Sequence, residues 1–164
     1  MDKIDQGEYW NGDAGKRWVE FSDRLDKMMI PFADAIMERA NISENDDVVD
    51  VGCGAGILSQ MAAERANSVL GLDISEPLIA HSKTRAAHLS NIDFMHGDAG
   101  TTTLDTPKDL LISRFGVMFF EDPVAAFSNL HGNMKSDGRL VFADAPTMAT
   151  DFTDCRTLRI WPSE

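Results

Sequence analysis

The chain has 164 residues, of which 43% are apolar and 26% charged, and its formal net charge is −12. This length fits one domain that buries about two thirds of the surface its unfolded chain would expose. The acidic excess argues against a nucleic-acid partner, because phosphate binding needs clustered Lys and Arg. No apolar run approaches the ~20 residues that span a bilayer. We therefore expect a single domain over residues 1–164, with neither a nucleic-acid partner nor a membrane segment.

The N-terminus and the cysteine content predict a cytoplasmic location. Residues 1–5 carry charges and lack the apolar core of a signal peptide. Cys53 and Cys155 are too few to make a disulfide framework. A reducing cytoplasm is the usual compartment of such a chain.

Residues 8–41 predict an N-terminal helical segment. Apolar residues recur there at spacings of three and four, which indicates one apolar stripe along a helix. The residues of this stripe are Trp18, Phe21, Leu25, Met28 and Met29. Pro31 suits the first turn of a second helix, which would end near residue 41.

Residues 48–144 alternate between short apolar runs and helical patterns, which predicts the core of the domain. The expected strands are 48–51, 68–72, 92–96, 109–113 and 139–143, and the expected helices are 57–66, 78–89 and 123–134, with a turn at 136–138. Strands separated by helices of this length indicate right-handed crossovers. We therefore expect an α/β fold, doubly wound, with a mainly parallel sheet and helices on both faces.

A turn with three glycines at alternate positions follows the first predicted strand. Gly52, Gly54 and Gly56 would let the backbone approach a ligand closely, because no Cβ intervenes. The second predicted strand ends about 20 residues later at Asp73, where nucleotide-binding α/β units carry a carboxylate for the ribose hydroxyls. Together the two features predict a ligand that contains a nucleoside.

The spacing of the glycines decides which nucleoside is expected. A dinucleotide fingerprint has a third glycine at the sixth position, where this chain has Ile57. The pattern is instead D-x-G-x-G-x-G, beginning at Asp50, and it resembles motif I of class I methyltransferases that depend on S-adenosylmethionine (SAM). An NAD(P)-dependent reductase is the alternative, which Ile57 and the lack of a Tyr-x-x-x-Lys pattern disfavour.

The resemblance extends from Tyr9 to about Asp144 and points to bacterial enzymes that methylate small molecules, a group that includes the ubiquinone and menaquinone methyltransferases. It implies a Rossmann-like fold, SAM as the cofactor and a small-molecule substrate. The segments that carry it, besides the glycine turn, are Gly71–Ser75, Gly97–Ala99, Ser113–Phe120 and Asp122–Phe142, with Tyr9–Gly12, Gly15 and Trp18 matching the N-terminal segment of one bacterial branch.

The resemblance also implies roles in the glycine turn. Gly52, Gly54 and Gly56 would line the methionine and ribose portion of SAM. Asp50 would orient the turn or reach the SAM ammonium through water. Cys53 lies inside this turn and would be among the residues that contact the cofactor. We interpret it as a small packing residue rather than a nucleophile.

Further residues would bind the nucleoside by the same resemblance. Asp73 would accept hydrogen bonds from both ribose hydroxyls, since a carboxylate can take two donors at once. Ile74 would pack on the adenine face. Asp98 would accept from the adenine amino group, and the Ala99 N–H would serve a ring nitrogen.

The remaining implied positions lie where the substrate would enter. Arg114 would offer its backbone carbonyl to the SAM ammonium, and Phe115 would begin the substrate side. Tyr9 and Trp18 would close over the cofactor.

The sequence identifies neither a catalytic base nor a metal site. A base is needed only when the acceptor carries a proton that must leave. The sequence Ser113–Gly116 differs from the motif of enzymes that methylate DNA amino groups. His81, His88 and His96 lack a Cys or carboxylate at ligand spacing, so we expect no bound metal.

The tail, residues 145–164, is shorter than the corresponding part of the family and would lack part of the usual C-terminal strand pair. Residues 156–161 alternate polar and apolar, which predicts a strand beside the strand at 139–143, either in its own chain or in a partner's. Two functions remain. The first is a methyltransferase acting on a small apolar molecule, with a homodimer or heteromer completing the pocket or the sheet edge. The second is a SAM-binding module with little catalysis that acts as a partner subunit.

Overall fold

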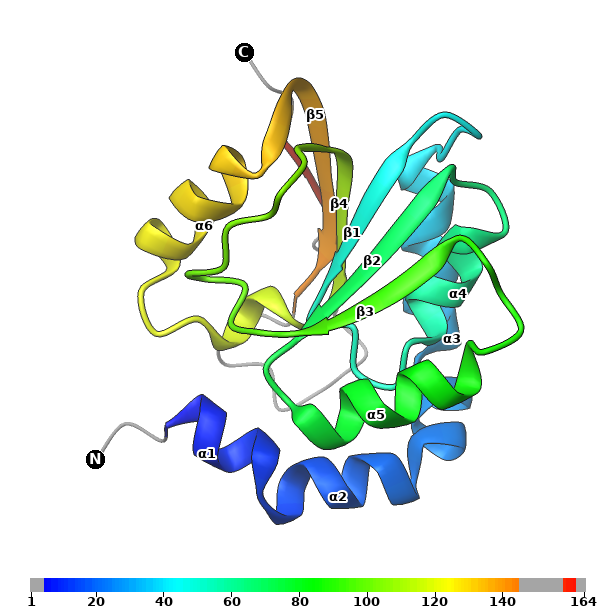
Figure 1. The fold of residues 1–164 in the computed structure, drawn as a ribbon, viewed down its shortest axis with the longest axis vertical. Coiled ribbons are helices and arrows are strands. Elements are labelled where there is room, and N and C mark those ends of the chain that lie inside the picture. The colour runs from blue at the N-terminus through cyan, green and yellow to red at the C-terminus, as the bar shows by residue number, and fades with distance from the viewer. Residues whose placement is uncertain (1–4, 145–157, 162–164) are drawn as a thin grey trace.

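The computed structural model describes residues 5–144 and 158–161 (Figure 1). Three helices come first, and strands and helices then alternate to the end of the described chain. The elements are α1 (Gln6–Asn11), α2 (Asp13–Glu20), α3 (Ser22–Ala40), β1 (Asp47–Val51), α4 (Ile57–Ala63), β2 (Ser68–Asp73), α5 (Glu76–Arg85), β3 (Ile92–His96), β4 (Lys108–Arg114), the short 3₁₀ helix η1 (Val117–Phe119), α6 (Pro123–Gly132), β5 (Met134–Ala143) and β6 (Leu158–Trp161).

The strands form one sheet in the order β3-β2-β1-β4-β5-β6. The first five strands are mutually parallel, and β6 runs antiparallel to β5. The order reverses at β1, which lies between β2 and β4. In open parallel sheets, such a reversal creates a crevice at the carboxyl ends of the neighbouring strands. The predicted doubly wound α/β fold is confirmed.

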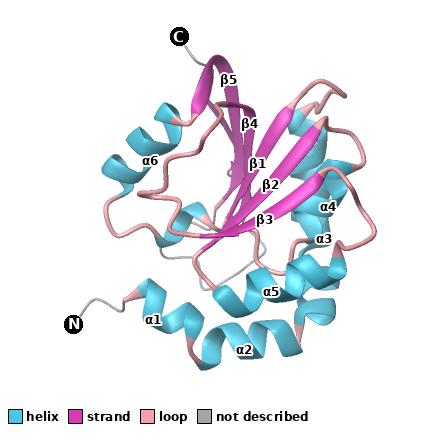
Figure 2. Cartoon of the chain, in the orientation of Figure 1, coloured by secondary structure: helices cyan, strands magenta, loops and turns pink. Residues whose placement is uncertain are grey.

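Two apolar layers cover the sheet because successive strand residues point to opposite faces. In β1, Val48 packs with α3 and α4, while Val49 packs with α6. In β4, Leu110 and Leu111 divide between the same two layers. Figure 2 shows α3, α4 and α5 on one face of the sheet and α6 on the other. No helix in the described part of the chain is long and apolar enough to cross a membrane.

The N-terminal segment is helical as expected, but its details differ from the prediction. Pro31 does not begin a second helix. It lies inside the continuous α3, on an exposed face where water can replace the missing backbone hydrogen bond. The predicted apolar stripe is wrong in part, because Phe21 is 48% and Met28 66% exposed, whereas Met29 is buried. The face of α3 that packs on the domain instead carries Ser22, Asp26, Met29, Ala33, Ile36, Met37 and Ala40.

Several element boundaries move as well. The helices α4, α5 and α6 end at residues 63, 85 and 132, a few residues before the predicted ends at 66, 89 and 134. The turn predicted at 136–138 lies within β5. The reason is an irregular register between β4 and β5: Lys108 pairs with Met134, whereas Leu110 pairs with Arg139, so a bulge in β5 takes up the additional residues.

The tail supplies the predicted final strand to its own sheet. The described residues 158–161 form β6, in which Leu158 pairs with Ala143 and Trp161 with Leu140. The edge of β5 is therefore covered within the chain. The other residues of the tail, Cys155 among them, lie outside the described residues.

Gly71 provides a test of the packing between β2 and β3. A Cβ at Gly71 would lie 2.4 Å from Cδ1 of Phe94 and 3.0 Å from Sγ of Cys53. We expect Gly71→Ala to lower the free energy of unfolding in urea by about 1 to 3 kcal/mol, because overpacking displaces a buried ring.

Gly132→Ala is the matched control, since a Cβ there would meet nothing within 4 Å. At the end of α6, this change should be neutral or stabilise by up to about 1 kcal/mol. Equal unfolding energies for the two variants would contradict the close packing described for Gly71.

Candidate functional site

A cavity of about 460 Å³ lies at the carboxyl ends of β1, β2 and β4. The loops that follow these strands and β3 form its walls, while α1, α2 and the start of α6 contribute further lining residues. This volume lies within the range of small-ligand pockets, roughly 300 to 1,000 Å³. The position agrees with the crevice that the reversal of strand order at β1 creates.

The three glycines of the turn after β1 adopt conformations that other residues rarely accept. Gly52, Gly54 and Gly56 have φ values of +67°, +55° and +82°. A Cβ at Gly52 would lie 2.6 Å from Cα of Gly116, in the loop after β4. The two loops therefore touch backbone to backbone, and only glycine permits this approach.

Asp73 holds the end of β2 to the glycine turn. Its Oδ2 accepts a hydrogen bond from the Gly54 N–H at 2.8 Å, and its Oδ1 accepts from the Ser75 N–H at 2.8 Å. Burial raises the pKa of the Asp73 carboxyl, and these hydrogen bonds act in the opposite direction. A carboxylate has about four acceptor positions, so about two remain for a ligand in the cavity that Asp73 lines.

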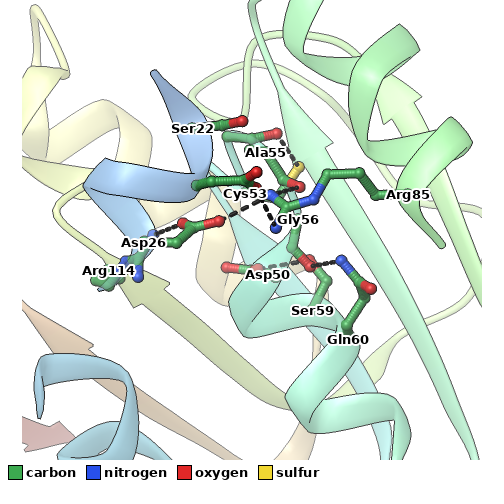
Figure 3. A network of polar contacts seen from close by, with 12 residues as sticks. Ser22, Asp26, Asp50, Cys53, Ala55, Gly56, Ser59, Gln60, Arg85 and Arg114 are labelled. Carbon is green, nitrogen blue, oxygen red and sulfur yellow. Dashed lines mark hydrogen bonds and ion pairs between the residues drawn. The ribbon is translucent and has the colours of Figure 1, made fainter. Parts of the chain in front are cut away.

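Asp50 lies beneath the glycine turn, on the side of the sheet that α4 covers. Its Oδ2 accepts a hydrogen bond from Ser59 Oγ at 2.6 Å, whereas its Oδ1 is buried without a hydrogen-bond partner (Figure 3). Burial raises the pKa of Asp50 to about 7, opposed by the Ser59 hydrogen bond and the charge of Arg114. Asp50 is also among the residues that line the cavity.

Arg114, at the end of β4, takes part in a buried charge network that the sequence analysis missed. Asp26 of α3 accepts from Arg114 Nη2 at 3.2 Å and from Arg85 Nη1 at 2.7 Å. Arg85 also donates to the carbonyl of Ala55 at 3.1 Å, so the network connects α3, α5, β4 and the glycine turn (Figure 3). One sequence feature could have indicated this network: Asp26 comes four residues after Ser22, on the face of α3 that packs on the domain.

Other predicted residues also line the cavity: Ile74, Asp98, Ala99, Phe115, Trp18, Cys53, Gly52 and Gly54. Asp98 has a local role as well, because its Oδ1 accepts from the Gly100 N–H at 2.8 Å and closes a turn. Phe115 has a left-handed backbone, with φ +64°, and its ring packs on Phe32 at a centroid distance of 5.1 Å. Burial raises the pKa of the Cys53 thiol, which supports a packing role.

Gly56 and Tyr9 do not reach the cavity. Gly56 begins α4, and a Cβ there would lie 2.9 Å from Cβ of Ser82 and 3.1 Å from the Phe94 ring, so helix packing explains this glycine. Tyr9 is 47% exposed and packs edge-on against Trp10 at 5.2 Å. Trp10, which the sequence analysis did not assign to the site, lines the cavity in its place.

The short helix α1 is tied over the outer side of the cavity. Asn11 Nδ2 donates to the carbonyl of Ile74 at 2.8 Å, and Asn11 Oδ1 accepts from the Glu76 N–H at 2.9 Å. Trp10 packs edge-on against Trp18 at 5.5 Å and against Phe119 at 5.6 Å. These contacts form an aromatic cluster in the wall of the cavity, although residues 10 and 119 are far apart in the sequence.

The titratable groups of the lining are mainly acidic. Its carboxylates are Asp5, Asp50, Asp73, Asp98, Glu121 and Asp122, against a single guanidinium, that of Arg114. Within the described part of the chain, no three His, Cys, Asp or Glu residues come together in a way that could hold a metal ion. His81 packs against Ser22, with 3.1 Å between Nε2 and Oγ. The lining favours a cationic ligand that also donates hydrogen bonds.

Comparison with known proteins identifies related sequences. A family model described as a methyltransferase domain matches residues 49–142, which is more than half of the chain. A mitochondrial ubiquinone biosynthesis O-methyltransferase from Schizosaccharomyces pombe is 28% identical, and the match covers 82% of this chain and 50% of that protein. Ribosomal RNA small subunit methyltransferase A from Alkaliphilus oremlandii is 40% identical, over 60% of this chain and 35% of that protein. The chain thus spans half or less of the length of these relatives.

A solved structure extends the likeness to the fold. Phosphoethanolamine N-methyltransferase 1 from Haemonchus contortus, in complex with phosphoethanolamine and S-adenosylhomocysteine, superposes with a TM-score of 0.68 at 25% sequence identity. The match covers 88% of this chain and 34% of that chain.

Asp50 predicts a pH-dependent stability. Its pKa of about 7 in the folded chain lies above the ordinary value of 3.8, so between these values the native state holds a proton that the unfolded state has lost. Stability therefore falls as pH rises through this window, by about 1.4 kcal/mol per unit for this group. We expect Asp50→Asn to gain about 2 to 3 kcal/mol in unfolding free energy relative to the wild type between pH 5 and pH 8. A difference that is constant with pH in urea titrations would contradict this.

Proposed function

The chain belongs to the methyltransferase-domain family, among the class I enzymes that depend on SAM, and we propose that it transfers the methyl group of SAM to a small, largely apolar molecule. The single observation that carries this proposal is the buried carboxylate of Asp73 at the end of β2. It is held by the Gly54 and Ser75 N–H groups and still faces the cavity with unused acceptor positions.

The residues of the cavity fit the parts of SAM. Asp73 suits a ribose diol, because two hydroxyl donors can share its remaining acceptor positions. The unpartnered Oδ1 of Asp50 suits an ammonium group. The acidic lining suits a sulfonium cation. In the same arrangement, Ile74 would pack along adenine, the Ala99 N–H would serve a ring nitrogen, and Asp98 would accept from the adenine amino group.

When bound, SAM supplies a methyl group that is already activated for displacement. The chain's own contribution is then to position the acceptor and exclude water, and positioning alone is worth roughly 7 to 11 kcal/mol in favourable cases. Trp10 and Phe119 close the outer side of the cavity, and the tether of Asn11 holds α1 in place. We assign no described residue as a catalytic base, and a base is needed only when the acceptor carries a proton that must leave.

A small apolar acceptor is supported by the lining. Phe115, Phe119 and Phe120, from the chain that follows β4, line the cavity, and Trp10 adds a further ring. The likeness to the ubiquinone O-methyltransferase agrees with this acceptor class. The net charge of −12 and the acidic cavity disfavour an RNA substrate, because both would repel its phosphates.

We propose a cytoplasmic location, on the low cysteine content described above. The homodimer or heteromer that was expected to complete the sheet edge or pocket stays a prediction. A partner is not needed to complete the edge at β5, because β6 already pairs with β5 within the chain.

Ligand binding tests the cofactor assignment. S-adenosylhomocysteine and SAM should bind in calorimetry, and Asp73→Asn should weaken S-adenosylhomocysteine by at least about 100-fold, because two hydrogen bonds to a charged group are lost. Asp105→Asn, an exposed carboxylate that does not line the cavity, is the matched control and should bind like the wild type. NADH should give no heat. If the chain binds NADH but not SAM, the NAD(P)-dependent reductase is favoured instead. Urea unfolding of each variant checks that it is folded.

Turnover separates the enzyme from a binding module. Incubation with SAM and apolar phenolic or quinol acceptors should form S-adenosylhomocysteine, detected by mass spectrometry. Tight binding of SAM without turnover on any acceptor of this class would favour the second function, that of a SAM-binding partner subunit.

A further inference from the structure

A second hollow, of about 740 Å³, lies on the outer side of the N-terminal helices, among residues 8–28. We call it the N-terminal groove. It is more open to solvent than the cavity described above. Six large apolar side chains are exposed in the described part of the chain, and three of them line this groove: Tyr9, Phe21 and Met28. Single exposed apolar residues are normal, whereas a cluster of them in one groove indicates a binding surface.

The apolar residues of the groove follow one another with the spacing of a helix–helix seam. Trp18, Phe21, Leu25 and Met28 come at intervals of three, four and three residues, across the junction of α2 and α3. This is the spacing with which one helix packs along another. The domain itself uses a different face of α3, the one that carries Asp26. Part of the seam therefore faces outward, where a partner helix can pack on it.

Four charged side chains line the same groove, in an order that separates the two signs. Glu8 and Asp13 come first, and Arg17 and Arg24 follow. Figure 1 shows α1 and α2 one after the other along the lower edge of the domain, so the acidic and basic ends of the groove lie apart. Within residues 5–144 and 158–161, Glu8, Arg17 and Arg24 form no ion pair.

This order of charges is complementary to itself. Two copies related by a two-fold axis place the acidic end of each groove against the basic end of the other, because such an axis makes the same surface face itself in reverse. The four charges of the groove also sum to zero, although the net charge of the chain is −12. A second copy would therefore meet a neutral surface here.

We propose that the N-terminal groove binds a second copy of this chain, in a two-fold dimer that buries Tyr9, Phe21 and Met28 and pairs the acidic end of each copy with the basic end of the other. This interface differs from the sheet edge, which β6 covers. Trp10 and Trp18 line both the groove and the cavity, so the second copy lies against a wall of the cavity. The dimer does not depend on the proposed cofactor.

The mass of the full chain in solution tests the apolar part of this interface. Sedimentation equilibrium at micromolar concentrations and physiological salt should give the mass of two chains. Met28→Glu should weaken the dimer by at least about 100-fold, because each dimer would then bury two carboxylates without partners. Val124→Glu is the matched control: Val124 is 80% exposed on α6 and does not line the groove, so this variant should dimerise like the wild type.

Two double variants test the charges. Arg17→Glu with Arg24→Glu makes the groove wholly acidic, and Glu8→Lys with Asp13→Lys makes it wholly basic. Each double variant alone should dimerise at least about 10-fold more weakly than the wild type, because like charges then meet across the axis. An equimolar mixture of the two should recover a mixed dimer at least as tight as the wild-type dimer, since every charge again meets its opposite. Unfolded variants could not give this recovery.

Three results would overturn the proposal. A wild type that stays monomeric leaves the groove to a different protein or an apolar ligand. A dimer that Met28→Glu leaves unchanged has its interface on another surface. A mixture that associates as weakly as its two components rules out the charge pairing. Should a charge variant fail to unfold cooperatively in urea, the comparison of Met28→Glu with Val124→Glu decides. None of these measurements uses SAM, so the proposed methyltransferase function stands or fails separately.

Discussion

The site depends on how closely the turn after β1 approaches its neighbours. Gly52 touches the backbone of Gly116, and Gly54 donates to the carboxylate of Asp73, so one turn is held by the loops that follow β4 and β2. A side chain at Gly52 would separate the two loops, and loss of the carboxylate would release the turn. These contacts lie beside the cavity, at the carboxyl ends of the strands where the strand order reverses.

Charged side chains that are shielded from water lie in the same region. Asp50 and Asp26 are buried near α3, α4 and the sheet, and Asp26 pairs with the partly buried Arg85 and Arg114. Burying charge costs free energy unless each group is paired, and here Asp50 Oδ1 and Arg114 Nη1 have no hydrogen-bond partner. Part of the stability of the domain is therefore given up for groups that a ligand can satisfy, which is common at functional sites.

Much of the site could be predicted from local patterns. Asp73 follows from its position at the end of an apolar run, and Gly52 and Gly54 from their spacing after another. The network of Asp26, Arg85 and Arg114 could not be predicted in this way, because its members are 59 and 88 positions from Asp26 and meet only when α3 packs beside β4 and α5. Gly56 shows the opposite error, since it has the same spacing as the other glycines but faces Phe94 and α5 rather than the cavity.

Sequence alone determined the class of the fold, the places of its five parallel strands and the nature of the turn after β1, because periodicity, turn residues and glycine conformations act over a few neighbouring residues. Tertiary structure decided what depends on contacts between distant segments. It kept Pro31 inside one long helix, drew residues 134–138 into β5 through a bulge, and used β6 to cover the edge of β5. It also decided which charges are buried together, since burial is a property of the packed chain.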